Sequence, residues 1–423
     1  MSLTKDEPEG SALADRAVLV SVDTGEYDAQ VSIDELEELA RTAGAECVAK
    51  VIQKRPVPDS ATYIGSGRAE ELRDEAAALS ADLLIFDAEL TANQIRNIEN
   101  ITDIRVVDRT TLILDIFAAR AVSAEGRIQV ELAQQKYRLA HLAGKGAELS
   151  RQGGGIGTRG PGETRLETDR RHIRRRIGEL SEELVDIRRH RDLIRSRRKK
   201  DNVLTAAIVG YTNAGKSTLL NALTNAGVLS EDKLFATLDV TSRSIALPDG
   251  RSVLLSDTVG LIRRLPHNLV EAFRSTLEEA SGADIILNVV DISSETAREE
   301  AMVTAEVLHD LGCDEIPKVT IFNKCDRLPG AWNIPDDETT VKICAKTGEG
   351  FEKMLECIAR NLPADYKRMT LLVPYSDGNV INTIIEYGGK VFSTEYEAEG
   401  TKIDALVSNR LDLGRYCFSA DTK

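Results

Sequence analysis

The sequence predicts an α/β protein with a mostly parallel sheet, and three observations support that prediction. The chain has 423 residues, whereas a domain usually holds ~100–200 residues, so we expect two to four folding units. Short β-branched apolar runs alternate with helix-like segments near the start of the chain and again after residue 200, as in parallel sheets. Between these regions, two segments repeat apolar residues at heptad spacing, which predicts a pair of helices.

We expect four parts along the chain. Residues 1–125 form an N-terminal α/β domain, residues 126–200 a long antiparallel helical hairpin with a Gly/Arg-rich loop, residues 201–365 an α/β domain, and residues 366–423 a small C-terminal α/β domain. Within the last part, the pattern predicts a strand from Met369, a helix over 379–387, and strands over 391–397 and 402–407.

Composition limits the class of protein. Hydrophobic residues make up 42% of the chain and charged residues 29%, which argues against a disordered or fibrous protein. No apolar run approaches the ~18 residues of a membrane span, and the first ten residues are acidic. We therefore expect a cytoplasmic protein without stable membrane insertion. The six cysteines form no Cys-x-x-Cys pair, so free thiols are expected rather than zinc ligands or disulfides.

Charge is distributed unevenly along the chain. The formal net charge of −15 would by itself argue against a nucleic-acid partner. Residues 151–200, however, contain 16 Lys and Arg against 8 Asp and Glu. A basic segment is therefore embedded in an acidic protein.

The basic segment coincides with the predicted hairpin. Its seam positions are Ile128, Leu132, Gln135, Leu139 and Leu142 in one helix and Ile173, Ile177, Leu180, Leu184, Ile187, Arg191 and Ile194 in the other. Glycine permits close backbone approach, while arginine binds phosphate and stacks on bases, so residues 151–163 predict a fingertip loop that contacts RNA. The phosphate contacts are expected from Arg170, Arg171, Arg174, Arg175, Arg176, Arg188, Arg189, Arg195, Arg197 and Arg198. An interdomain spacer with a solvated charged face is the alternative.

The N-terminal domain offers one weak signal. Strands are expected over 17–22, 45–52, 82–86 and 104–107. Between the second and third of them, Gly65-Ser66-Gly67 precedes a helix and could present backbone amides to a phosphate. A plain helix start explains the same residues, because the third glycine and the acidic partner of a dinucleotide site are missing.

A phosphate-binding loop is the strongest signal in the chain. The apolar strand over 203–209 enters the sequence Gly210, Tyr211, Thr212, Asn213, Ala214, Gly215, Lys216, Ser217 and Thr218, and a leucine-rich helix follows. Small residues let successive amides face the phosphates, Lys216 spans the β and γ phosphates, and the Ser217 hydroxyl ligates Mg²⁺. This P-loop predicts a nucleotide-binding site.

Two further segments complete the phosphate side of that site. A strand ends in Asp257, Thr258, Val259 and Gly260, which predicts Asp257 as an acid near the metal and Gly260 as an amide near the γ-phosphate. The segment Phe235, Ala236, Thr237 and Leu238 lies where a switch threonine would complete the metal shell. Thr237 and Thr241 both qualify, and Thr237 is preferred. Lys216, Thr237 and Gly260 are therefore the expected catalytic residues.

The base is expected to be guanine. Asn323, Lys324 and Asp326 follow a strand, and the Asp326 carboxylate can accept hydrogen bonds from both guanine N–H donors, which adenine lacks. Asn323 would brace this pocket. A later strand leads to Cys344, Ala345 and Lys346, where an amide near Ala345 would reach the guanine carbonyl. GTP and GDP are therefore the expected nucleotides.

The residue after Gly260 has a consequence for catalysis. Many GTPases carry there a glutamine that orients the attacking water, whereas this chain has Leu261, which cannot form that hydrogen bond. We expect slow intrinsic hydrolysis. A core-filling role for Leu261 is less favoured, because a switch residue beside the γ-phosphate is seldom fully packed.

The motifs resemble those of one family, the HflX ribosome-associated GTPases, over nearly the whole chain. The resemblance includes residues 63–67, 107–110, 114–117, 129–134 and 150–171, together with the segments over 210–218, 235–239, 257–260 and 265–267. The chain departs from the family pattern at Leu261, where phenylalanine is usual, at Cys344, where serine is usual, and over 240–242, where Pro-Thr-Thr is common. None of these departures removes an essential ligand.

The resemblance implies a P-loop GTPase that binds the large ribosomal subunit and its RNA, with the hairpin directed toward the peptidyl-transferase region. Bacterial members of the family can split ribosomes. We expect a monomer and no DNA partner. Two alternatives stay open: a GTPase serving ribosome assembly or tRNA modification, and an ATP-dependent RNA remodeller acting through the N-terminal domain.

Overall fold

The structure, a computed structural model, forms two compact units. The first comprises residues 1–185 with 233–235 and 263–273, and the second comprises the remainder. The described residues are 14–142, 161–200, 203–224, 234–235, 241–264, 279–328, 330, 337–363, 366–387, 389–408 and 411–417, with the side chains of the 161–200 helix described over 167–198.

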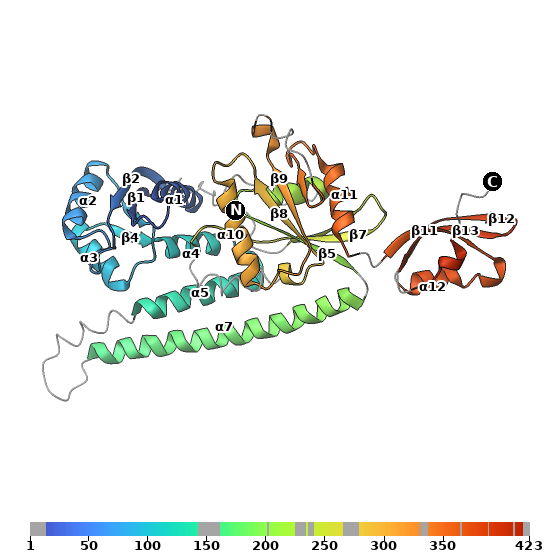
Figure 1. The fold of residues 1–423 in the computed structure, drawn as a ribbon. Helices are drawn as coiled ribbons and strands as arrows, with labels where there is room; N and C mark the ends of the chain where they lie inside the picture. Colours follow the sequence, from blue (N-terminus) through green and yellow to red (C-terminus); the bar gives the residue numbers. More distant parts are fainter. Residues whose placement is uncertain are drawn as a thin grey trace, which may run out of the picture. The chain divides into compact units, whose positions relative to one another are not determined.

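The first unit contains a parallel four-stranded sheet in the order β2-β1-β3-β4 (Figure 1). Its strands are β1 (Arg16–Asp23), β2 (Glu46–Lys54), β3 (Leu83–Phe86) and β4 (Arg105–Asp108), and its helices are α1 (Ala29–Ala43), α2 (Ser66–Ala78), α3 (Ala92–Thr102) and α4 (Arg109–Arg120). The chain runs first from β1 outward to β2 and then back past β1 to β3. The strand order therefore reverses between β1 and β3. All four predicted strands are present.

Local sequence explains where these helices begin. The Asp28 carboxylate caps α1 by accepting from the amides of Gln30 and Val31, and Asp108 caps α4 by accepting from the amide of Thr111. Thr91 and Gln94 form a reciprocal capping box at the start of α3. Each cap satisfies amides that the helix leaves without a partner. Because Asp108 is both the last residue of β4 and the cap of α4, the strand passes directly into the helix.

Two helices follow, α5 (Ala124–Leu142) and α7 (Pro161–Lys200). Figure 1 shows α7 as the long helix with α5 alongside its N-terminal half, and Arg176 joins them by donating to both Glu131 carboxylate oxygens at 2.7 and 2.9 Å. At 40 residues, α7 is ~60 Å long. The predicted seam is visible as a stripe of buried and half-buried positions through Ile173, Leu180 and Ile187, but Ile194 is 41% exposed. Of the fingertip loop predicted over 151–163, residues 151–160 lie outside the described residues, whereas residues 161–163 are not loop but the first residues of α7.

The second unit is centred on a six-stranded sheet in the order β10-β9-β8-β5-β7-β6, in which all strands are parallel except β6. The strands are β5 (Leu204–Gly210), β6 (Thr241–Ala246), β7 (Ser252–Asp257), β8 (Ile285–Asp291), β9 (Lys318–Asn323) and β10 (Thr340–Lys342). The helices packed on them are α8 (Lys216–Thr224), α10 (Ala297–Asp310) and α11 (Phe351–Asn361). The expected mostly parallel sheet is confirmed.

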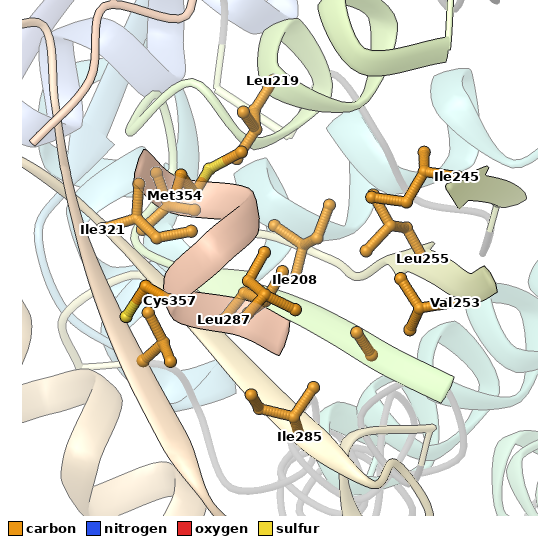
Figure 2. Packing of buried hydrophobic residues seen from close by; sticks show 14 of the residues in the cluster. Ile208, Leu219, Ile245, Val253, Leu255, Ile285, Leu287, Ile321, Met354 and Cys357 are labelled. Carbon is orange, nitrogen blue, oxygen red and sulfur yellow. The ribbon is translucent and has the colours of Figure 1, made fainter. Parts of the chain in front are cut away.

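A single apolar cluster binds α8 and α11 to this sheet. Figure 2 shows side chains of the central strands, among them Ile208 and Leu287, with Met354 of α11 beside Ile321. Each of these four residues is fully buried. Because burial of such side chains contributes ~1.5–3 kcal/mol each, the cluster holds the ends of the parallel strands in fixed register. Those strand ends carry the predicted site.

The last part of the second unit is a three-stranded antiparallel sheet in the order β11-β13-β12 with one helix. Its elements are β11 (Tyr366–Val373), α12 (Val380–Glu386), β12 (Lys390–Glu397) and β13 (Gly400–Ser408). The strand predicted from Met369 is present as β11 and begins three residues earlier, at Tyr366. The α/β fold class is thus confirmed.

Two expectations about composition can be compared with the structure. All six cysteines are free thiols, and Cys313, Cys325, Cys344 and Cys357 are buried. Within the described parts of the chain, no helix has both the length and the hydrophobicity to cross a membrane.

Candidate functional site

The candidate site lies at the carboxyl ends of four parallel strands, β5, β7, β9 and β10. Parallel strands bring these ends to the same edge of the sheet. The loop between β5 and α8 begins at Gly210. Within it, Asn213 and Gly215 adopt positive φ angles of +60° and +94°. Gly215 is required there, since a Cβ would lie 2.2 Å from Asn323 Nδ2. The turn aims the following amides at the space above the start of α8.

Lys216 is buried at the base of this loop. Its side chain folds back so that Nζ donates to the carbonyls of Gly210 and Tyr211 at 3.0 and 2.7 Å. Burial lowers the pKa of Lys216 to about 8, and the nearby Asp257 carboxylate opposes part of that fall. An anion arriving beside Nζ would therefore stabilise the charged ammonium.

Ser217 and Asp257 meet at the candidate metal position. The Ser217 hydroxyl donates to Asp257 Oδ2 at 2.9 Å, and Asp257 is fully buried at the end of β7. A hydroxyl and a carboxylate are hard oxygen ligands, the type that Mg²⁺ prefers, so the pair fits this ion. The other predicted ligand, Thr237, lies outside the described residues, as do Ala236 and Leu238.

The segment after Asp257 packs directly against the P-loop. Thr258 Oγ1 donates to Ile208 O at 2.8 Å, the Leu261 amide donates to Gly210 O at 3.2 Å, and the Thr212 amide donates to Leu261 O at 2.7 Å. Gly260 has no room for a side chain, since a Cβ would lie 2.7 Å from Thr212 Cγ2 and 3.1 Å from Lys216 Nζ. Gly260 therefore lies beside Lys216.

Leu261 differs from the sequence expectation in its packing. Its side chain is only 4% exposed, although we expected a switch residue beside the γ-phosphate to be incompletely packed. The backbone bridge to Tyr211 explains the difference, because it holds residue 261 on the P-loop like an added strand. The chemical argument is unchanged, since a leucine side chain cannot orient a water molecule.

Asn323 ties the predicted base-binding segments to the P-loop. Its Nδ2 donates to Ala214 O at 2.8 Å, and its Oδ1 accepts from the Ala345 amide at 2.9 Å. One cavity of about 310 Å³ is bordered by Asn323, Ala345, Asp326 and Cys344. The Ala345 amide, which we expected to serve the guanine carbonyl, is therefore engaged by Asn323.

Asp326 stands at the open side of this cavity. Its side chain is exposed, and Oδ1 accepts from the Cys344 thiol at 3.2 Å. Lys324 has a positive φ of +61° and pairs with Asp291 at 2.7 Å. Sequence analysis did not identify Asp291, although its position at the end of β8, among the other site strands, is a signal that could have found it. This pairing fixes the turn that presents Asp326.

The glycines proposed as a second phosphate site have an ordinary structural setting. Gly65 precedes α2 with φ +86°, and a Cβ there would lie 2.6 Å from an Arg55 guanidinium nitrogen. Helix α2 begins at Ser66 without a side-chain cap. The positive φ explains the first glycine without a ligand.

Three family models match consecutive parts of the chain. They are described as GTP-binding GTPase N-terminal over residues 30–118, GTP-binding GTPase Middle Region over residues 120–198, and 50S ribosome-binding GTPase over residues 205–324. Their order and coverage agree with the resemblance found from the motifs.

Curated relatives extend this match over nearly the full chain. A protein of Lacrimispora saccharolytica named GTPase HflX is 51% identical over 406 residues, which cover 94% of this chain and 95% of the relative. The chain belongs to the HflX family of GTPases. The GTPases HflX of Caldanaerobacter subterraneus subsp. tengcongensis and Escherichia coli are 49% and 40% identical, cover 93% and 86% of this chain, and are themselves covered over 91% and 87%.

Membership in the HflX family confirms the predicted activity: the protein binds guanine nucleotides and hydrolyses GTP. Among solved structures, a crystal structure of an SsGBP and GDP complex aligns with a TM-score of 0.47 at 25% identity, covering 82% of this chain and 98% of that chain.

The first prediction concerns base recognition by Asp326. Replacing Asp326 with asparagine should lower GTP affinity by at least about tenfold, because each hydrogen bond to a charged group contributes ~1.5–3 kcal/mol. The variant should prefer xanthosine triphosphate, whose base edge suits an amide. Competition binding against a fluorescent nucleotide measures both effects. Asp74→Asn, at an exposed aspartate on α2, is the matched control. An unchanged preference for GTP in Asp326→Asn would contradict the assignment.

The second prediction concerns Lys216. Its pKa in the free protein is about 8, and a bound polyphosphate should raise it, so nucleotide binding above pH 8 must take up a proton. GTP affinity should therefore fall as pH rises through about 8, approaching a tenfold loss per pH unit. Titration calorimetry at pH 8.5 in two buffers of different ionisation enthalpy should show uptake of most of one proton, and much less at pH 7. Equal uptake at both pH values would contradict this account.

Proposed function

We propose that the protein binds the large ribosomal subunit in its GTP-bound form and leaves after GTP hydrolysis, acting as a monomer in the cytoplasm. The main support is helix α7, whose arginines from Arg170 to Arg198 extend along ~42 Å of the helix in an otherwise acidic chain. The matching family model described as 50S ribosome-binding GTPase and the HflX relatives support the same partner.

The arginines of α7 are placed for contact with a polyanion. Arg171, Arg174, Arg188 and Arg197 are exposed, and exposed ion pairs such as Arg175 with Glu179 contribute little to stability. A helix that served only as a spacer would need the buried seam but not this run of charge. Contact with RNA phosphates therefore explains the exposed arginines of α7, which helix packing does not require.

The nucleotide site supports a division of roles among its residues. We assign phosphate binding to the loop residues Asn213 to Thr218, which include Lys216. We assign contact with the γ-phosphate to the Gly260 amide. Asp326, braced by Asn323, would recognise guanine. When bound beside Ser217, Asp257 and Thr237, Mg²⁺ would neutralise charge on the phosphate oxygens. Lys216 and Gly260 would stabilise the charge that develops on the transferred phosphoryl group.

The four-part division predicted from sequence fits this function. Residues 1–125 and 201–365 would form the two α/β domains, residues 126–200 the RNA-contacting hairpin, and residues 366–423 an accessory domain. If binding excludes the small subunit, the protein would split or recycle ribosomes. Sedimentation of intact ribosomes with the protein and a non-hydrolysable GTP analogue tests this point, and binding to assembly precursors or tRNA alone would favour the alternatives.

A third prediction follows from Leu261. Basal GTP turnover should be slow, and isolated large subunits should raise it by at least about tenfold, because ordering of a GTPase site by a partner can contribute ~10³–10⁵-fold. Phosphate release measured with large subunits, small subunits or neither checks this. Equal rates with and without large subunits would exclude the ribosome as activator.

A fourth prediction separates RNA contact from a spacer. Replacing Arg171 and Arg174 with alanine should leave GTP affinity unchanged, because neither residue borders the nucleotide site. Affinity for large subunits should fall, and the slope of log affinity against log salt should become shallower by roughly one unit for each arginine that meets a phosphate. Arg73→Ala, an exposed arginine on α2 paired with Asp74, is the matched control. Parent affinity and slope in the double variant would support the spacer.

A further inference from the structure

The N-terminal sheet has the strand arrangement at which α/β proteins commonly bind a ligand, and the crevice here means the group formed by Ser21, Glu35, Asp87 and Arg109 at that position. Its strand order reverses between β1 and β3, and ligands bind at the carboxyl ends of the strands at such a point. Asp87 follows β3 there and is fully buried. Its carboxylate accepts from Ser21 Oγ at 3.2 Å and from Arg109 at 2.8 Å, and Arg109 also donates to Glu35 at 2.9 Å. The crevice is therefore a preformed polar site.

The first unit itself supplies the group that fills this crevice. Arg264 follows the Asp257–Gly260 motif by four residues, and its guanidinium donates to Asp87 Oδ2 at 3.1 Å, to Asp87 O at 3.1 Å and to Ser32 Oγ at 3.2 Å. It also lies 4.1 Å from the centre of the Tyr27 ring, a cation–π distance. Three acceptor oxygens and an aromatic face favour a planar guanidinium with several donors over an ammonium.

The backbone around Arg264 is held as well. Arg109 donates to the Arg263 carbonyl at 3.0 Å. Arg264 itself adopts a positive φ of +51°, which is unfavourable for arginine, so the crevice contacts must offset that strain. Two acids, Glu35 and Asp87, here face two arginines. Without Arg264, the buried Asp87 would lose one of its cationic partners.

Helix α4 also anchors the other switch segment. The Phe235 ring packs edge-on against Phe117 of α4, with ring centroids 4.6 Å apart, and Phe235 is 2% exposed with φ +54°. Arg109 begins the same helix. Phe235 and Arg264 are thus both bound within the first unit.

The covalent chain links this crevice to the nucleotide site. Leu261, three residues before Arg264, is bonded to Gly210 and Thr212 of the P-loop, and Gly260 is packed against Thr212 and Lys216. A γ-phosphate must enter between Lys216 and the Gly260 amide. Leu261 on the P-loop and Arg264 in the crevice are the two ends of a short segment that directly follows the Gly260 amide.

We propose that the crevice between β1 and β3 is a binding site for the Arg264 guanidinium, and that its occupancy favours GDP over GTP at the nucleotide site. By thermodynamic reciprocity, GTP binding then favours release of Arg264. The crevice binds a side chain of its own protein. Its proposed effect on the preference for GDP or GTP does not depend on which partner the protein has.

Affinities of purified full-length variants for GDP and for a non-hydrolysable GTP analogue test the proposal. Arg264→Ala should shift the ratio of the two affinities toward the GTP analogue by about fivefold or more, the lower range of typical coupling between sites. Arg264→Lys should give an intermediate shift, because an ammonium cannot make the forked contacts. The Arg264 side chain is 34% exposed, so these substitutions should leave the fold intact.

Two further variants complete the test. Asp87→Asn should shift the ratio in the same direction, and adding it to Arg264→Ala should change the ratio little further, because both changes remove the Arg264–Asp87 pair. Asp87→Asn also removes the pair with Arg109, which does not involve the Arg264 side chain. Arg243→Ala is the matched control, since Arg243 is an exposed arginine on β6 whose guanidinium contacts the Ser242 carbonyl. An unchanged ratio in Arg264→Ala, or an equal shift in Arg243→Ala, overturns the proposal.

Discussion

The side chain of Asn323 is the contact on which the nucleotide site depends. One buried amide group bridges the P-loop at Ala214 and the segment after β10 at Ala345. A buried amide requires partners for both of its ends, and here each partner belongs to a different binding segment. The approach is close enough that only glycine fits at position 215. The phosphate and base halves of the site are therefore held in one geometry.

Burial of charge gives the same site its sensitivity to ligand. Lys216 and Asp257 are almost without solvent contact, and desolvation in the free protein disfavours the ammonium form of the lysine. Polyphosphate binding relieves that cost. Much of the selectivity for a charged ligand thus comes from Lys216, whose ammonium form is poorly stabilised until the ligand binds.

The segments around Phe235 and Arg264 connect the hydrolytic site to the rest of the chain. Both residues take left-handed backbone conformations that cost free energy for residues other than glycine, and both are held by contacts from α4 or the crevice beside it. Strain of this kind persists only where surrounding contacts offset it. A GTPase that must respond to a partner needs such segments to have a second arrangement available.

Much of this protein could be predicted from sequence because its signals are local. Three signals require only neighbouring residues: the strand-loop-helix pattern around Gly210, the heptad spacing through Leu180 and the acid at the end of β7. The strand, loop and helices that they predict are present. Family membership could also be recognised, because HflX motifs recur along the chain in the same order. Asp326 could be predicted as a guanine-binding residue for the same reason, since the role expected of it follows from the residues beside it.

Other features required the tertiary structure, because they join residues far apart in the chain. Nothing local to Leu261 indicates that its backbone is bonded to the P-loop and its side chain buried. The Ala345 amide was expected to face the base, yet Asn323, which is 22 residues away, accepts its hydrogen bond. Arg264 and Asp87 are separated by 177 residues, and Phe117 gives no sequence sign of its contact with Phe235. Local pattern determines which elements form and which chemical groups they carry, whereas the partner that each buried polar group accepts is decided only when the chain is packed and those groups must be satisfied.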